Sequence, residues 1–137
     1  MKTALIVIRV LTSLSGLILL GLGILFWTGN ALELVPLHIT AGFVLVLSLW
    51  ALSFMAARVG IPVGALVLPL AWSLIMPALG LTQERLLVSS AHWVIQVVHL
   101  LVGLGAFGFA GALTARINQA LAKDAAAQPR QTAEPSH

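Results

Sequence analysis

Four long apolar stretches constrain the fold of this chain more than any other feature. They cover about residues 4–27, 34–58, 62–80 and 89–116. Each is close to the roughly 20 residues that a helix needs to cross a bilayer. The chain is 60% hydrophobic and 8% charged, whereas a soluble domain is about 25% charged. The composition therefore predicts a membrane protein in contact with the lipid bilayer.

Short polar breaks separate the four stretches. Residues 28–30 (Thr-Gly-Asn), 60–62 (Gly-Ile-Pro) and 82–85 (Thr-Gln-Glu-Arg) contain the residue types that end helices and form turns. Helices joined by connections this short pack as antiparallel neighbours. The sequence predicts one all-α domain over residues 1–117, a transmembrane four-helix up-down-up-down bundle.

The composition changes after the last apolar stretch. Residues 118–137 are rich in alanine, glutamine and proline. We expect a short helical continuation that ends in a disordered polar tail. Because this tail buries little apolar surface, we expect that it can be deleted without loss of folding.

The basic residues predict the orientation of the bundle. Cytoplasmic loops carry an excess of lysine and arginine. Segments on one side of the predicted membrane hold six such residues, and the other side holds only Arg85. The six are Lys2, Arg9, Arg58, Arg116, Lys123 and Arg130. Both termini are therefore expected in the cytoplasm of a multi-pass protein of the bacterial cytoplasmic (inner) membrane.

Several functional classes are excluded by what the sequence lacks. The chain has no cysteine, which excludes disulfides, thiolate chemistry, iron–sulfur clusters and cysteine-ligated zinc. The basic residues are scattered and form no patch for nucleic acid. No phosphate loop, dinucleotide motif or nucleophile–base pattern is present. Whether the protein is an enzyme stays open.

The last apolar stretch carries a polar stripe. His92 and His99 are seven residues apart, so they share one helix face. Gln96 lies between them, and Gly103 follows His99 by one turn. Ionisable residues within a membrane span are costly and indicate a functional site by default.

The second stretch supplies a partner for this stripe. His38 is its only ionisable residue before the terminal arginine. Counted from the cytoplasmic ends of the two helices, His38 lies between His92 and His99 in depth, so either pairing is geometrically open. A shared pattern favours His99, because His38 and His99 are each followed by a glycine four residues later, Gly42 and Gly103.

A histidine with a glycine on the same face suggests how a cofactor could be held. The glycine leaves bare backbone against which a flat macrocycle can lie. We expect His38 and His99 to bind the iron of one haem b, with Gly42 and Gly103 as notches for the porphyrin. Covalent attachment would need cysteine. Three side chains near the outer surface are candidates to hydrogen-bond or neutralise a propionate: His92, Gln96 and Arg85.

This arrangement resembles the small four-helix, bis-histidine b-type cytochromes of bacterial membranes, which include quinone-linked and superoxide-oxidising members. The resemblance covers the four spans and the two histidine–glycine units. It implies electron transport through haem iron, with quinol or a larger membrane redox complex as partner. Those proteins often carry two haems on four histidines. Only three histidines lie in apolar sequence here, so one outer haem is expected.

Other interpretations remain open. His38 and His92 lie in first turns, where an imidazole can anchor a helix at the membrane interface. His99 lies deeper, where it could hydrogen-bond a neighbouring group. The alternative function is a non-catalytic membrane subunit or assembly factor that docks a partner through its glycine-rich helix faces. A transporter is less favoured, because no acidic residue lies inside the spans. The sequence leaves a homo-oligomer open.

Overall fold

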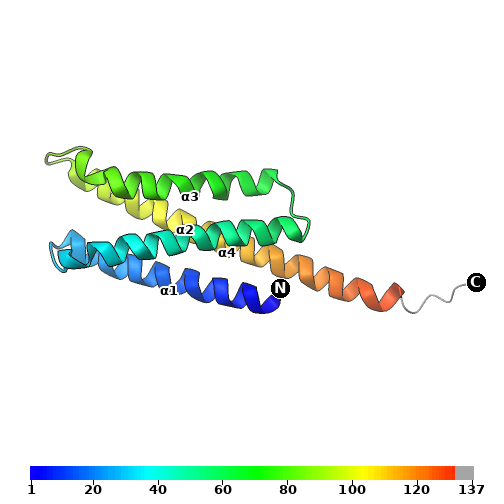
Figure 1. Ribbon diagram of the computed structural model, residues 1–137. Helices are drawn as coiled ribbons and strands as arrows, with labels where there is room; N and C mark the ends of the chain where they lie inside the picture. Colours follow the sequence, from blue (N-terminus) through cyan, green and yellow to red (C-terminus); the bar gives the residue numbers. More distant parts are fainter. Residues whose placement is uncertain (132–137) are drawn as a thin grey trace, which may run out of the picture.

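The chain folds into four long helices joined by short loops (Figure 1). The computed structural model describes residues 1–131, with side chains described through residue 127. The long helices are α1 (Lys2–Trp27), α2 (Val35–Arg58), α3 (Gly64–Thr82) and α4 (His92–Gln131), and two single 3₁₀ turns are η1 (Leu32–Leu34) and η2 (Gln83–Arg85). No strand occurs within residues 1–131. The all-α prediction is confirmed, and the helix boundaries match within three residues except at the end of α4.

The helices alternate in direction, which gives the molecule two distinct ends (Figure 1). The α1–α2 and α3–α4 loops lie together at one end, called here the His92 end. The start of α1 and the α2–α3 connection lie toward the opposite end, called the Lys2 end. α2 and α4 contact each other, and each also contacts α1 and α3. Over the described residues α1 and α3 do not touch, so α2 and α4 form the short diagonal of the bundle.

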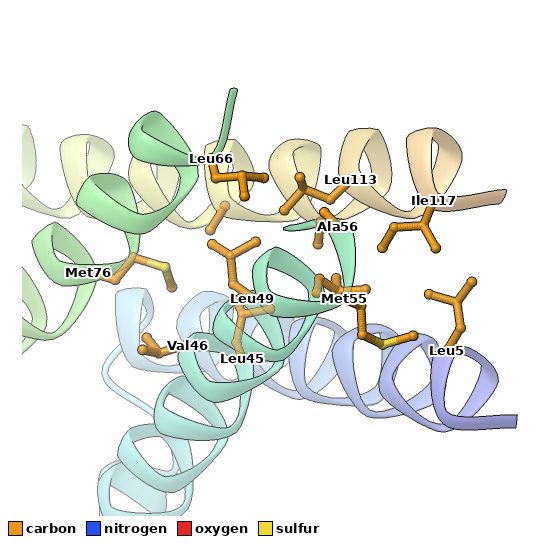
Figure 2. Packing of buried hydrophobic residues seen from close by; sticks show 13 residues of the cluster. Leu5, Leu45, Val46, Leu49, Met55, Ala56, Leu66, Met76, Leu113 and Ile117 are labelled. Carbon is orange, nitrogen blue, oxygen red and sulfur yellow. The ribbon is translucent and has the colours of Figure 1, made fainter. Parts of the chain in front are cut away.

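The interior is built from aliphatic residues at helical spacing (Figure 2). Leu45, Leu49 and Leu52 repeat at intervals of four and three residues and therefore line one face of α2. Leu49 and Leu52 are completely buried. They belong to one cluster with Leu113 and Ile117 of α4. This cluster fixes the contact between the two diagonal helices.

The outer surface of the bundle is also apolar. Leu17 on α1, Leu47 on α2 and Leu74 on α3 are 70%, 60% and 58% exposed. A soluble bundle keeps its outward faces polar. All four helices are long and apolar enough to cross a membrane, and their exposed faces are compatible with lipid contact.

Two indole groups tie neighbouring helices together by hydrogen bonds. Trp50 on α2 donates from Nε1 to the Ser73 hydroxyl oxygen on α3 at 2.7 Å. Trp72 on α3 donates from Nε1 to the Val102 carbonyl oxygen on α4 at 2.8 Å. Together the two bonds link α2, α3 and α4 along the middle of the bundle.

The two helices that precede a tight connection end in the same way. α2 is followed by Gly60 at φ +79°, and the Ile61 amide donates to the Ala56 carbonyl at 3.1 Å. α1 is followed by Gly29 at φ +74°, and the Asn30 amide donates to the Leu25 carbonyl at 2.9 Å. Both are Schellman motifs, in which glycine adopts a left-handed conformation that other residues reach only at a cost.

α4 continues well beyond the other helices (Figure 1). Its helical conformation extends to Gln131, which is a longer continuation than the sequence predicted after residue 117. Leu121 packs against the core cluster. That the segment from residue 118 can be deleted without loss of folding stays a prediction. The remainder of the predicted disordered tail, residues 132–137, lies outside the described residues.

Candidate functional site

The structure brings His38 and His99 together across the short diagonal. His38 is the fourth residue of α2 and His99 is the eighth residue of α4. The centres of their imidazole rings lie 6.1 Å apart, and the ring planes are inclined by 37°. Of the two pairings that the sequence left open, His38 with His99 is the one adopted.

Each ring has a buried nitrogen without a hydrogen-bond partner among the described residues. The Nδ1 atoms of His38 and His99 are buried and have no hydrogen-bond partner among the described residues. A buried polar atom without a partner costs about 1–3 kcal/mol. Such atoms are rare in folded proteins, and one explanation is a ligand that completes the site. The two rings that carry these atoms are neighbours, and a ligand that reached either nitrogen would remove this cost.

A glycine from the adjoining helix faces each ring. A Cβ atom placed on Gly23 of α1 would lie 3.9 Å from the Cε1 atom of His38. A Cβ atom placed on Gly80 of α3 would lie 3.1 Å from the Cε1 atom of His99. The lack of a side chain at these two positions lets each ring approach the neighbouring backbone closely. All four helices therefore contribute to the pair.

Gly42 and Gly103, which were expected to form notches for the porphyrin, do not border the histidine rings. A Cβ atom on Gly42 would meet only Leu19 of α1, at 3.9 Å, and one on Gly103 would meet no atom within 4 Å. Neither glycine is therefore in contact with a histidine ring. The expected notches were assigned along the same helix as each histidine, whereas the glycines that border the rings are Gly23 and Gly80.

An aromatic ring covers His38 from the side. The Phe26 ring on α1 lies 5.4 Å from the His38 ring, inclined by 57°. Phe26 and the two glycines were not recognised in the sequence. Their common signal is only their place near the helix ends that precede the two loops at the His92 end, and this does not reveal which way they face.

The other candidate residues lie closer to the His92 end. His92 is the first residue of α4, and its Nδ1 donates to the Leu86 carbonyl oxygen at 3.1 Å. Gln96 is half-buried one turn further along, and Arg85 is exposed at the end of η2. His92 is thus held by the loop, separate from the His38–His99 pair.

The pair provides too few ligands for a bare metal ion. Within the described part of the chain, no three histidine or acidic side chains gather to hold one. Structural and catalytic zinc sites use three or four protein ligands. A haem iron already has four porphyrin nitrogens and needs only axial ligands from the protein. Two facing imidazoles therefore fit a haem better than a bare ion.

No protein-family model matches the chain, and no curated protein or solved structure matches it.

Proposed function

We propose that this chain is a multi-pass protein of the bacterial cytoplasmic membrane that transfers electrons through one haem b bound by His38 and His99. The observation that carries the proposal is the facing pair of imidazoles with their unpartnered buried nitrogens. Either nitrogen of a neutral imidazole can ligate a metal.

The separation of the two rings supports a shared iron. Each bond from an imidazole nitrogen to a metal is about 2 Å, so two nitrogens that bind one iron lie at most about 4 Å apart. Each ring centre lies roughly 1 Å behind its nitrogen, which puts the ring centres at about 6 Å for such bond lengths. The value in the structure is 6.1 Å.

The chain's own residues would bind and surround the cofactor. His38 and His99 would hold its iron, and Phe26 would provide an apolar wall beside His38. A haem iron with two imidazole ligands supplies one-electron transfer when bound. Its potential depends on burial and on hydrogen bonds around the ligands.

The charge distribution supports an orientation in which the Lys2 end is cytoplasmic. Five basic residues lie on the helix segments toward that end: Lys2, Arg9, Arg58, Arg116 and Lys123. Among the basic side chains that the structure describes, only Arg85 lies at the opposite end. The excess agrees with the positive-inside rule. Trp27 and Trp93, which are 47% and 58% exposed, lie at the opposite end, where an aromatic belt at the outer interface is expected.

The same orientation would bring the haem close to the outer surface. His38 lies in the first turn of α2, so a propionate would have a short path to water. His92, Gln96 and Arg85 are the side chains available to pair with it. Quinol or a membrane redox complex is the proposed electron donor or acceptor at this end.

An absorbance experiment tests the haem assignment. The protein is purified in detergent, reduced and oxidised, and the difference spectrum is recorded before and after addition of haemin. We expect bis-histidine bands at one haem per chain. The variants His38→Ala and His99→Ala should lose the bands while retaining helical circular dichroism.

His92→Ala is the matched control, because it removes an imidazole seven residues from His99 on the same helix. This variant should keep the absorbance bands at one haem per chain, because His92 is proposed to pair with a propionate and not to bind the iron. The haem proposal fails if the wild-type protein binds no haem. It also fails if His92→Ala loses the bands as completely as His99→Ala does.

A second candidate function is supported by the open glycines of α4. Cβ atoms placed on Gly108 and Gly111 would meet no atom of the chain within 4 Å, so bare backbone is left for another helix to approach. In this case the protein would be a non-catalytic subunit of a membrane complex. Gly108→Leu should then release a co-purifying membrane protein without altering the haem spectrum. An unchanged composition of the purified sample would argue against this candidate.

A further inference from the structure

A shallow cavity of about 340 Å³, open to its surroundings, lies between the beginning of α1 and the later part of α4, far along both helices from the histidine pair. Its lining comes from the beginning of α1 and from the part of α4 that continues past the core. The lining residues are Lys2, Leu5, Ile6, Arg9, Asn118, Leu121, Ala122 and Ala125.

The cavity follows from the residue spacing on the two helices. On α1 the lining residues occupy positions i, i+3, i+4 and i+7, and the same spacing recurs on α4. This is the spacing of one helix face, so each of the two helices lines the cavity with one face. On α4 that face includes Ala122 and Ala125, whose short side chains do not fill the space between the helices.

The lining combines positive charge with apolar surface. Lys2 and Arg9 bring two cations, Asn118 brings an amide, and no acidic side chain of the described residues lines the cavity. Leu5 and Ile6 lie between the two cations on α1. The charge therefore favours an anion, while the aliphatic wall favours a hydrocarbon.

In the proposed orientation the cavity lies at the level of the lipid headgroups. α1 contains 26 residues, or roughly 39 Å at the helical rise, whereas the hydrocarbon core is about 30 Å thick. With Trp27 at the outer interface, the hydrocarbon would end about 20 residues back along α1. Arg9 then lies near this boundary, and Lys2 lies roughly 10 Å further into the headgroup layer.

We propose that this cavity binds one anionic phospholipid of the cytoplasmic leaflet. The phosphodiester lies between Lys2 and Arg9, and an acyl chain runs along Ile6 toward the hydrocarbon. Basic pockets between helices on the cytoplasmic side are suited to anionic headgroups. A lipid fits better than a free phosphate, because aliphatic side chains make up much of the lining. The inference depends on the proposed membrane insertion but not on haem.

Native mass spectrometry of the detergent-purified chain tests the site. The protein is titrated with phosphatidylglycerol and, separately, with phosphatidylcholine of the same acyl chains, and bound lipids are counted. We expect one phosphatidylglycerol to bind at least tenfold more tightly than phosphatidylcholine. Each of Lys2→Gln and Arg9→Gln should weaken phosphatidylglycerol binding about fivefold, the effect of one cation near an anionic lipid.

Two further variants separate the cavity from general surface charge. Arg116→Gln removes the same charge beside a different cavity, formed by α3 and α4, and should leave the affinity unchanged. Ala122→Leu keeps every charge but fills the proposed site, and should reduce binding as strongly as Arg9→Gln does. Inorganic phosphate is added as a competitor at millimolar concentration and should not displace the lipid.

The proposal is overturned by equal affinities for the two lipids, by an equal loss in Arg116→Gln, or by unchanged binding in Ala122→Leu. Displacement by inorganic phosphate would identify a free phosphate as the ligand and would also overturn it. Lipid counting does not depend on haem content, so a colourless protein that binds phosphatidylglycerol would separate the two proposals.

Discussion

A single methyl group added beside each histidine should have opposite effects on stability. The two substitutions are Gly80→Ala on α3 and Gly23→Ala on α1. Both glycines lie within the last turns of their helices near the His92 end, and both are half-buried. Each faces the Cε1 atom of a histidine. The variants therefore differ mainly in the space available to the new methyl group.

The distances determine the expected magnitudes. At Gly80 the new Cβ atom would lie 3.1 Å from the His99 ring, whereas carbon atoms pack best at about 3.5–4.0 Å. The ring must yield by roughly 0.4 Å or more, and overpacking of this kind costs about 1–3 kcal/mol. At Gly23 the distance of 3.9 Å to the His38 ring is an ordinary contact. Replacing a helical glycine by alanine contributes about 0.5–1 kcal/mol of stability at both sites.

The gain in helix propensity is the same in both variants and therefore cancels when they are compared. Gly80→Ala should thus be less stable than Gly23→Ala by about 1–3 kcal/mol. Unfolding in mixed micelles of dodecyl maltoside and increasing dodecyl sulfate, followed by tryptophan fluorescence, measures this difference. The chain has four tryptophans to report it. Equal midpoints for the two variants, or a lower midpoint for Gly23→Ala, would refute the assigned packing around the rings.

Two further substitutions test the bonds between helices. Ser73→Ala removes the acceptor of the Trp50 indole and should destabilise the bundle by about 0.6–1.7 kcal/mol, measured by the same unfolding assay. Ser53→Ala is its control, because that hydroxyl bonds only within its own helix, and an equal loss there would contradict the interhelical role. Gly105→Ala would place a Cβ atom 2.8 Å from Trp72, whose indole is already held by a hydrogen bond. The substitution should lower the free energy of unfolding by about 1–3 kcal/mol. Its control is Gly108→Ala on the same helix, because a Cβ atom there would meet no atom within 4 Å. An equal loss in the two variants would show that the indole is free to move.

The helices could be predicted because their signals are local. Apolar length defined the four spans, and Gly29 and Gly60 marked two helix ends that need a left-handed residue. The end of α4 was missed for a different reason. The segment after residue 117 is polar and does not form a membrane span, yet its alanines favour helix and Leu121 still packs against the core. The change in composition predicted a short helical continuation, and α4 instead extends to Gln131.

The candidate site was predictable only in part. Depth along each helix, counted from the terminal arginines, placed His38 and His99 at similar levels, and their rings do meet. The partners of the rings could not be found in this way. Gly42 faces Leu19 of α1, because the rotation of α2 about its axis is set by its leucine face in the core. That rotation depends on packing between helices, which spacing along one helix does not reveal.

The helix pairs that contact one another follow a symmetric pattern. Exchanging α1 with α3 and α2 with α4 leaves the set of contacting helix pairs unchanged. In the same exchange His38 corresponds to His99, and Gly23 corresponds to Gly80. In both cases Cε1 is the ring atom nearest to the glycine. The hairpin of α1 and α2 and the hairpin of α3 and α4 thus occupy corresponding places in the set of helix contacts. The two imidazoles meet between these hairpins, so each hairpin contributes one histidine to the candidate site.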